Sequence, residues 1–298
     1  EWMGFLKKPA DREKIWEWLF EQAGECDYAI LSVDTLVYGN IIGSRIHTYS
    51  MEECRETMDR FRQLKKQNPQ LHIHAFNLAA RVAAYNDNHE DPEYWQEYGY
   101  DIWRYTWLWD KKKRAGISEK EAEALESLQK KIPKEIMQDF LERRKTDRFV
   151  NLTSVELVRE NVFDILTVPK DDTAEFGYAA LDQMAIMQKA EEEQLMNRVY
   201  CYPGADEVGS VIFARVFCRI KQYQPVFYVR YSSLTGSSVI PLYEDRPLGE
   251  SIKWQILSAG GICSETPADA DCMLAVNAPG TCQIESANQK SGRIFASD

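Results

Sequence analysis

Runs rich in apolar and β-branched residues alternate with amphipathic helical runs along most of this chain, and this alternation constrains its fold more than any other feature. The pattern predicts a strand within 27–39 that ends near Asp34, and further strands at 71–82, 163–172, 198–202, 225–233 and 270–280. Helices are predicted between them, at 11–23, 51–67, 177–194, 208–221 and 249–261. Repeated βα units with unbroken apolar strands indicate an α/β fold with a mostly parallel sheet, either barrel-like or open and doubly wound.

One stretch, residues 83–147, departs from this alternation. It is rich in aromatic side chains between Tyr94 and Trp109, and apolar residues then recur at helical spacing up to Phe140. We therefore expect an α/β core domain formed by residues 1–82 and 148–298, with residues 83–147 as a helical, aromatic-rich insertion. The aromatic rings could stack on sugars, although packing of the insertion onto the core is the commoner use of such spacing.

The charge balance limits the partners. The chain of 298 residues has a net charge of −11, which disfavours nucleic acid and anionic membranes as partners, because both attract basic surfaces. No apolar run is long enough to cross a bilayer.

The seven cysteines show no pairing pattern, which favours reduced thiols and a cytoplasmic location. The oligomeric state stays open, and the N-terminus suggests an internal excerpt of a longer protein.

Polar side chains follow nearly every predicted strand. In a parallel sheet these positions meet at the carboxyl edge, where ligands bind. The candidate catalytic residues are Asp171, Asp172, Asp206 and Glu207. The candidate substrate-binding residues are Asp34, Asn77, Arg81, Arg230, Glu244, Asp245, Arg246 and Asn277, and Arg45 could also offset the acidic charge or bind a substrate anion.

The two acidic doublets need more explanation than the single acids do. One acidic residue at a strand-to-helix turn is explained by helix capping. Two adjacent carboxylates repel each other, which raises the pKa of one of them unless a ligand, a cation or an arginine compensates. The pairs Asp171–Asp172 and Asp206–Glu207 therefore favour acid–base chemistry or metal binding.

Other chemistries find little support in the sequence. The P-loop, the dinucleotide-binding glycine motif, the nucleophile elbow and the zinc-protease motif are all absent. His72 and His74 share one face of a strand, but a structural pair is the commoner explanation, since no further ligand has suitable spacing. We assign no metal ligands and expect no cofactor, although Mg²⁺ or Mn²⁺ could bind to oxygen ligands from Asp34, Asp171, Asp172 and Asp206.

Several long motifs carry a resemblance to a known family. They are DTLVYGNIIGSRIH, VPKDDTAEFGYAALDQ, YPGADEVG, RYSS, YEDRPLGESI and VNAPG. Together they resemble the bacterial domain-of-unknown-function family 4127 over essentially the whole chain. That resemblance implies a longer protein, which begins with a Pro-Leu-Asp-x-Arg-Pro strand that is absent here, and it implies no established activity.

A second likeness is local. The segment YPGADEV is similar to the Gly-Gly-Asp-Glu motif of β-hexosaminidases, although Ala205 replaces the second glycine. That similarity implies a substrate-orienting role for Asp206 and a general-acid role for Glu207. The segment VPKDD is similar, more loosely, to the Asp-Asp pair of other acetamido-assisted glycosidases.

We therefore expect a hydrolase that acts on a polar small molecule, a glycoside or an amino-sugar derivative, by carboxylate general acid–base catalysis. Glu207 would be the general acid, with Asp206 orienting it or the substrate, and Asp171 and Asp172 would form the complementary pair. Two alternatives stay open. One is a Mg²⁺- or Mn²⁺-dependent enzyme that uses the same carboxylates, and the other is a non-catalytic sugar-binding or assembly protein.

Overall fold

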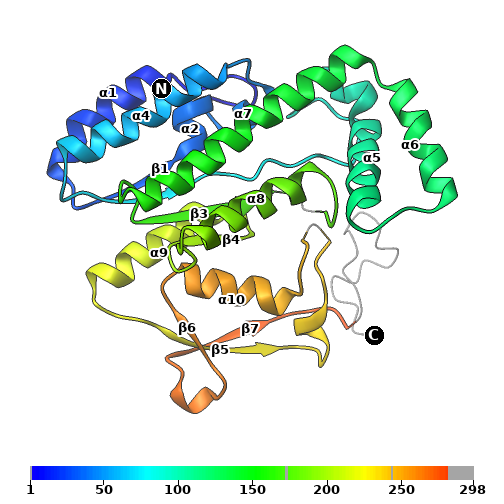
Figure 1. The fold of residues 1–298 in the computed structure, drawn as a ribbon. Helices are drawn as coiled ribbons and strands as arrows, with labels where there is room; N and C mark the ends of the chain where they lie inside the picture. Colours follow the sequence, from blue (N-terminus) through cyan, green and yellow to red (C-terminus); the bar gives the residue numbers. More distant parts are fainter. Residues whose placement is uncertain (1, 172–173, 243, 281–298) are drawn as a thin grey trace. The chain divides into compact units, whose positions relative to one another are not determined.

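The computed structural model describes residues 2–171, 174–242 and 244–280, and the chain divides into two compact units (Figure 1). The first unit is Glu1–Cys201 and the second is Tyr202–Asp298. Their strands form separate sheets, of four and three strands within the described residues, and every pairing for which a register is defined is parallel. The prediction of an α/β fold with parallel sheets and alternating βα units is confirmed.

The first unit is built around the four-stranded sheet, whose strand order β1-β2-β3-β4 follows the sequence. The strands are β1 (Tyr28–Ser32), β2 (His72–Phe76), β3 (Ile165–Lys170) and β4 (Val199–Pro203), the last of which carries the chain into the second unit. The helices are α1 (Arg12–Gln22), α2 (Val33–Tyr38), α3 (Ile41–Ile46), α4 (Met51–Gln67), α5 (Trp95–Arg114), α6 (Glu119–Lys131), α7 (Lys134–Arg159) and α8 (Tyr178–Glu192).

The strand predicted to end near Asp34 ends at Ser32, and the segment after it forms helix α2. The Ser32 hydroxyl accepts a hydrogen bond from the Thr35 amide at 3.1 Å and caps the N-terminus of α2. Gly39, at φ +94°, ends the helix in the left-handed conformation. A short apolar run that is buried on all sides shows no periodicity that separates strand from helix. Asp34 therefore lies in the first turn of α2 and not at a strand end.

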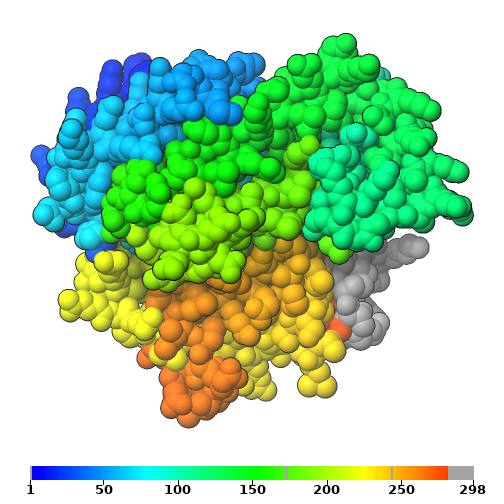
Figure 2. Space-filling model, in the orientation of Figure 1, coloured from blue at the N-terminus to red at the C-terminus, as the bar shows by residue number. Residues whose placement is uncertain are grey.

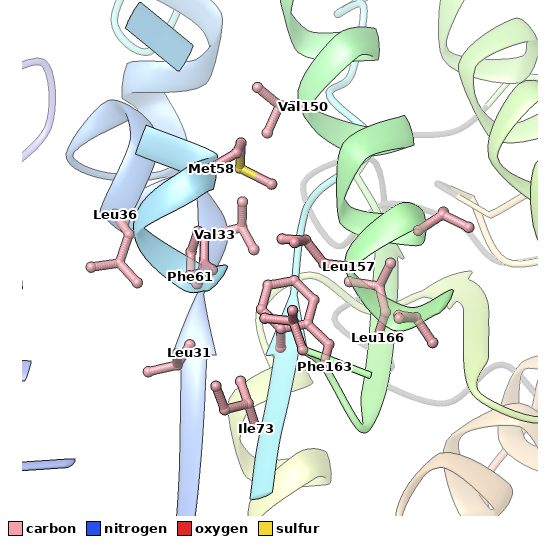
Figure 3. Packing of buried hydrophobic residues seen from close by; sticks show 14 of the residues in the cluster. Leu31, Val33, Leu36, Met58, Phe61, Ile73, Val150, Leu157, Phe163 and Leu166 are labelled. Atoms are coloured by element: carbon pink, nitrogen blue, oxygen red, sulfur yellow. The ribbon is translucent and has the colours of Figure 1, made fainter. Parts of the chain in front are cut away.

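The core of the first unit lies between the sheet and the helices α4, α7 and α8. Figure 3 shows Met58 and Phe61 of α4 and Leu157 of α7 in one cluster with the strand residues Leu31 and Ile73. Helix α4 begins with a capping box, in which the Ser50 hydroxyl accepts from the Glu53 amide and the Glu53 carboxylate accepts from the Ser50 amide. This cap and the buried face of α4 explain why the predicted range 51–67 matches the helix.

Helices α5, α6 and α7 follow β2. In Figure 1, α7 runs from the α5–α6 end of the unit back to β3, and in Figure 2 the side chains of α5 and α6 (teal to green) form a lobe. Trp95 and Ile102 of α5 are buried against Phe140 of α7, so part of the aromatic run packs within this unit. Helix α7 continues past residue 147 and packs on α4 and α8. It therefore links the helical segment to the sheet.

The second unit holds the three-stranded sheet in the order β6-β5-β7. Its elements are α9 (Val208–Ile220), β5 (Val226–Tyr231), α10 (Leu248–Ser258), β6 (Ile262–Ser264) and β7 (Cys272–Val276). Because β5 and β7 are parallel, with Tyr231 opposite Val276, the segments that follow them leave the sheet at the same edge.

Candidate functional site

A buried carboxyl group links the carboxyl ends of β1 and β2. Asp34, only 4% exposed, accepts hydrogen bonds from the Asn77 side-chain amide at 3.2 Å and from the Leu78 backbone amide at 2.9 Å. The strands that deliver these residues pair in parallel, with Ser32 opposite Phe76. The predicted meeting of polar side chains at this edge is therefore found for Asp34 and Asn77.

Helix α7 supplies the other half of this network. The Asn77 side-chain oxygen accepts from Asn151 Nδ2 at 2.7 Å and from the Ser154 hydroxyl at 3.2 Å. Asn151 also donates to the Leu78 carbonyl at 3.0 Å. These bonds fix which way the Asn77 amide points, so its nitrogen faces Asp34.

Burial dominates the electrostatics of Asp34. It raises the pKa of this carboxyl group from 3.8 to about 7, although the hydrogen bonds from Leu78 and Asn77 oppose the change and the charge of Asp147 adds to it. Near neutral pH, Asp34 is therefore divided between its protonated and ionised forms. A group with this property can give or take a proton under physiological conditions.

His47 connects Asp34's surroundings to α7. Its Nδ1 accepts from the Tyr49 backbone amide at 3.2 Å, so the ring proton is on Nε2, which faces Asp147 Oδ1 at 3.2 Å. Tyr38 stacks on the His47 ring with 4.6 Å between centroids. Burial, and next the charge of Asp147, raise the pKa of the Tyr38 hydroxyl well above its ordinary value.

Two arginines with carboxylate partners lie at the same edge. Arg45 of α3 donates to Glu90 at 3.0 Å and to Asp171 at 2.5 Å. Arg81 donates to the same Glu90 at 3.2 Å and to Asp91 at 3.0 Å. Burial lowers the pKa of Arg81, but Asp91 and Asp171 outweigh it and raise the value overall. The predicted residues Arg45, Arg81 and Asp171 thus belong to one charged cluster.

A further buried ion pair, between α7 and α8, lies next to this cluster. Arg144 donates to Asp182, whose second oxygen accepts from Arg148 Nε at 2.6 Å, and Arg144 also donates to the Ala80 carbonyl at 2.7 Å. A small cavity of about 20 Å³ is lined by Arg45, Arg144 and Asp147, among others. This volume accommodates one water molecule. The buried Nε atoms of Arg45 and Arg144 have no hydrogen-bond acceptor within the described ranges. Both atoms can therefore donate to a water molecule or to a ligand oxygen.

A larger, open pocket of about 430 Å³ adjoins the small cavity, with Pro92 and Arg143 lining both. Its wall includes Tyr94, Glu135 and Asp139. Arg143 Nε donates to the His47 carbonyl at 2.9 Å, and His47 contacts Asp147. The pocket is therefore connected by Arg143 to the His47–Asp147 pair.

In the second unit, Glu207 is held by a specific partner. Gln255 of α10 donates to its carboxylate at 2.5 Å. Gly204 has φ +126°, and a Cβ atom at this position would lie 2.5 Å from Glu207 Oε1. The Pro-Gly turn before the acidic doublet therefore has a physical reason, since it lets the Glu207 carboxylate fold back against the backbone.

Helix capping does not explain this doublet. Glu207 occupies the N-cap position of α9, but its side chain caps no backbone amide there. Asp206 is exposed and has no hydrogen-bond or ion-pair partner in the part of the chain that the structure describes. The roles of Glu207 as general acid and of Asp206 as orienting residue stay predictions.

The other predicted residues of the second unit lie in two groups. Asn277 follows β7 and accepts from the Ser232 hydroxyl, which follows β5, at 3.0 Å. In the loop before α10, Arg246 donates to Asp245 at 3.0 Å and Glu244 accepts from the Ser251 hydroxyl. Arg230 lies exposed within β5, opposite Ala275, and not at the sheet edge.

The structure thus gathers Asp34, Asn77, Arg45, Arg81 and Asp171 at one edge of the first sheet. Asp206, Glu207, Arg230, Glu244, Asp245, Arg246 and Asn277 belong to the second unit. Asp172 lies outside the described residues.

Sequence reasoning missed several members of the cluster in the first unit. They are His47, Asp91, Arg143, Arg144, Asp147, Asn151, Ser154 and Asp182. A signal existed for four of them, because Arg144, Asp147, Asn151 and Ser154 recur at helical spacing and mark one polar face of α7. Buried polar side chains on a helix that packs against a sheet must find partners there.

The described residues include no group of three or more His, Cys, Asp or Glu side chains that could hold a metal ion. His72 contacts Asp164 at 2.8 Å, and His74 is fully buried. None of the helices in the described ranges has the length and hydrophobicity that a membrane span requires.

Comparison with known protein families identifies a match over nearly the whole chain. A family model, described as "Protein of unknown function (DUF4127)", matches residues 1–297. No curated protein and no solved structure matches.

Proposed function

Since this chain belongs to the family of proteins of unknown function DUF4127, we propose a function from its site alone: hydrolysis of a polar small molecule, a glycoside or an amino-sugar derivative, by carboxylate acid–base catalysis. The observation that carries the proposal is Asp34, a buried carboxyl group with a pKa of about 7 at the carboxyl edge of a parallel sheet. Acid–base catalysis is most efficient when the pKa of the group lies near the working pH.

The surroundings of Asp34 support this role. Asn77, Asn151 and Ser154 form a rigid hydrogen-bonded support, so the position of the carboxyl group is fixed before a substrate binds. Beside this support, Asp147 contacts His47 Nε2 at 3.2 Å, and its charge adds to the raised pKa of Asp34. In this proposal Asp34 holds the proton, and these neighbours set its pKa and orientation.

The charged cluster beside Asp34 would bind the polar groups of the substrate. Arg45 and Arg81 share the Glu90 carboxylate, and this mutual pairing holds both guanidinium groups in place. Sugars and their derivatives have several hydroxyl groups, each of which can both donate and accept hydrogen bonds. A cluster that offers both guanidinium donors and carboxylate acceptors matches this requirement.

Glu207, in the second unit, is a second candidate acid. The hydrogen bond from Gln255 orients its carboxylate, as a group that acts on a substrate requires. We keep Glu207 as the proposed general acid of the second unit, with Asp206 beside it.

The test is hydrolysis of a panel of nitrophenyl glycosides, including N-acetylglucosaminides, by the purified chain. We compare the wild type with Asp34→Asn, Glu207→Gln and the control Glu126→Gln, which alters an exposed carboxylate on α6. We expect turnover by the wild type and the control, and a loss of about 100-fold or more in kcat for an acid that acts in catalysis. Circular dichroism checks that each variant is folded.

Two results would count against the proposal. Absence of turnover across the whole panel, with saturable binding of the same sugars, would favour a non-catalytic sugar-binding protein. Turnover that neither Asp34→Asn nor Glu207→Gln reduces would exclude both carboxyl groups from the proposed roles.

A further inference from the structure

The open pocket beside the charged cluster has the size of a small-molecule site. Its volume is about 430 Å³, and pockets for small ligands range from about 300 to 1,000 Å³. It lies entirely within the first unit, where α7, the 92–94 segment and the end of α3 contribute its walls. We propose that this pocket binds an amino sugar through its protonated amine; the inference deepens the proposed function and rests on it for the substrate class.

One wall of the pocket is polar and rigid. Arg143 donates to both oxygens of Asp139, at 2.9 and 2.8 Å, and to the Tyr94 hydroxyl at 3.1 Å. The Tyr94 hydroxyl in turn donates to Asp139 at 2.8 Å. With its Nε bound to the His47 carbonyl, the Arg143 side chain is held at all three nitrogens. The carboxylate of Asp139 keeps lone pairs for further donors such as sugar hydroxyls.

The rest of the wall includes apolar surface. Ile46, Pro92, Tyr94 and Ile136 line the pocket. A sugar ring has C–H groups on its faces and hydroxyl groups around its perimeter, so a lining that offers both apolar and polar side chains matches both parts. A purely ionic ligand would gain nothing from the apolar wall.

The charges of the pocket favour a cation. Its lining carries three carboxylates, Glu93, Glu135 and Asp139, against two cations, Lys7 and Arg143. Lys7 pairs with Glu93 at 2.5 Å and Arg143 pairs with Asp139.

Glu135 is the third carboxylate of the pocket lining. In the described part of the chain it has neither an ion pair nor a hydrogen bond. A protonated amine would supply the missing partner, whereas a carboxylate or phosphate ligand would be repelled.

The experiment is isothermal titration calorimetry of the full chain with three probes: glucosamine, N-acetylglucosamine and glucose. The pH is about 6.5, so that the amine of glucosamine is protonated. We expect saturable binding of glucosamine, and binding at least about fivefold weaker for the two neutral sugars. The variant Glu135→Gln should reduce glucosamine affinity about fivefold or more and leave the affinity for glucose unchanged. The control Glu126→Gln on α6 should behave as the wild type.

Three outcomes would overturn the inference: no saturable glucosamine binding, equal affinity for glucosamine and glucose, or glucosamine binding that Glu135→Gln leaves unchanged. Because Glu135 is exposed, its substitution should not unfold the chain, and circular dichroism verifies this. The readout is binding and not turnover. Glucosamine binding without glycoside hydrolysis would therefore sustain this site while removing the proposed activity, and hydrolysis without glucosamine binding would do the reverse.

Discussion

The Asn77 side-chain amide donates a hydrogen bond to the Asp34 carboxylate over 3.2 Å, although 43 residues separate the two in the chain. This contact joins the first turn of α2 to the end of β2 beneath the polar face of α7. It places a carboxyl group with a pKa near 7 inside the first unit.

Ionisation of Asp34 should make the stability of the chain fall as pH rises from about 4 to 7. In this range the unfolded chain has lost the proton, while the folded chain still binds it, so a higher pH favours unfolding. A rise in pKa from 3.8 to about 7 on folding corresponds to about 4 kcal/mol. Urea unfolding at several pH values measures the slope.

The variant Asp34→Asn supplies the comparison. It cannot ionise, so the fall in unfolding free energy between pH 4 and 7 should be smaller than in the wild type by a few kcal/mol. At pH 4, where Asp34 is protonated, the variant should be less stable than the wild type by about 1–3 kcal/mol, because its amide group opposes a donor from Leu78 or Asn77. Equal slopes for the two proteins would show that Asp34 titrates as an ordinary carboxyl group.

Removal of the Asp182 charge should strongly destabilise the first unit. Asp182 and Arg144 are both nearly buried, at 3% and 6% side-chain exposure, and Asp182→Asn would leave two arginines without their carboxylate. Breaking a buried pair of this kind costs about 3–5 kcal/mol. The midpoint of thermal or urea unfolding measures the loss.

A surface pair provides the matched control. Asp59 pairs with Arg62 at 2.7 Å, with half of the Asp59 side chain exposed, so Asp59→Asn should cost less than about 1 kcal/mol. If the two substitutions cost the same, the Arg144–Asp182 pair does not contribute as a buried pair.

Gly204→Ala should displace the Glu207 carboxylate. The new Cβ would lie 2.5 Å from Glu207 Oε1, and φ +126° is unfavourable for alanine. We expect a loss of about 1–2 kcal/mol in stability and a loss of glycoside turnover comparable to that of Glu207→Gln. Turnover at the wild-type rate in Gly204→Ala but not in Glu207→Gln would contradict this explanation of the glycine.

A second glycine, near the start of α9, provides the control for the effects of Gly204→Ala on stability and on turnover. An alanine Cβ at position 209 would meet no atom within 4 Å, so Gly209→Ala should raise stability by about 0.5 kcal/mol. Its turnover should match that of the wild type. Thermal unfolding and the glycoside assay give both readouts.

Chelation tests the dependence on a divalent metal. The oxygens of Asp34 and Asp171 already accept from amide and guanidinium donors, and a bound cation would have to displace these donors. We therefore expect the turnover of the wild type to survive exhaustive treatment with EDTA. Loss of turnover that Mg²⁺ or Mn²⁺ restores would favour the metal-dependent alternative.

The order of the elements and their parallel arrangement could be predicted from the residue pattern alone. Helix α4 matches its predicted range because Ser50 and Glu53 form a local capping box, and local hydrogen bonds are readable from neighbouring residues. Strand periodicity and the parallel pairing then predicted that Asp34 and Asn77 would lie close together. This prediction follows from the positions of the two residues after their strands and does not require their side-chain conformations.

The conformation of residues 33–38 and the partners of the buried polar groups depend on contacts between distant segments. An apolar run with no period can be a strand or a helix, and here the Ser32 cap and the packing of α2 selected the helix. His47 and Asp147 are 100 residues apart in the chain, and a pattern among neighbouring residues cannot predict a contact between such distant positions. The pKa of Asp34 likewise depends on burial by several elements at once, because desolvation is a property of the assembled unit and not of any one segment.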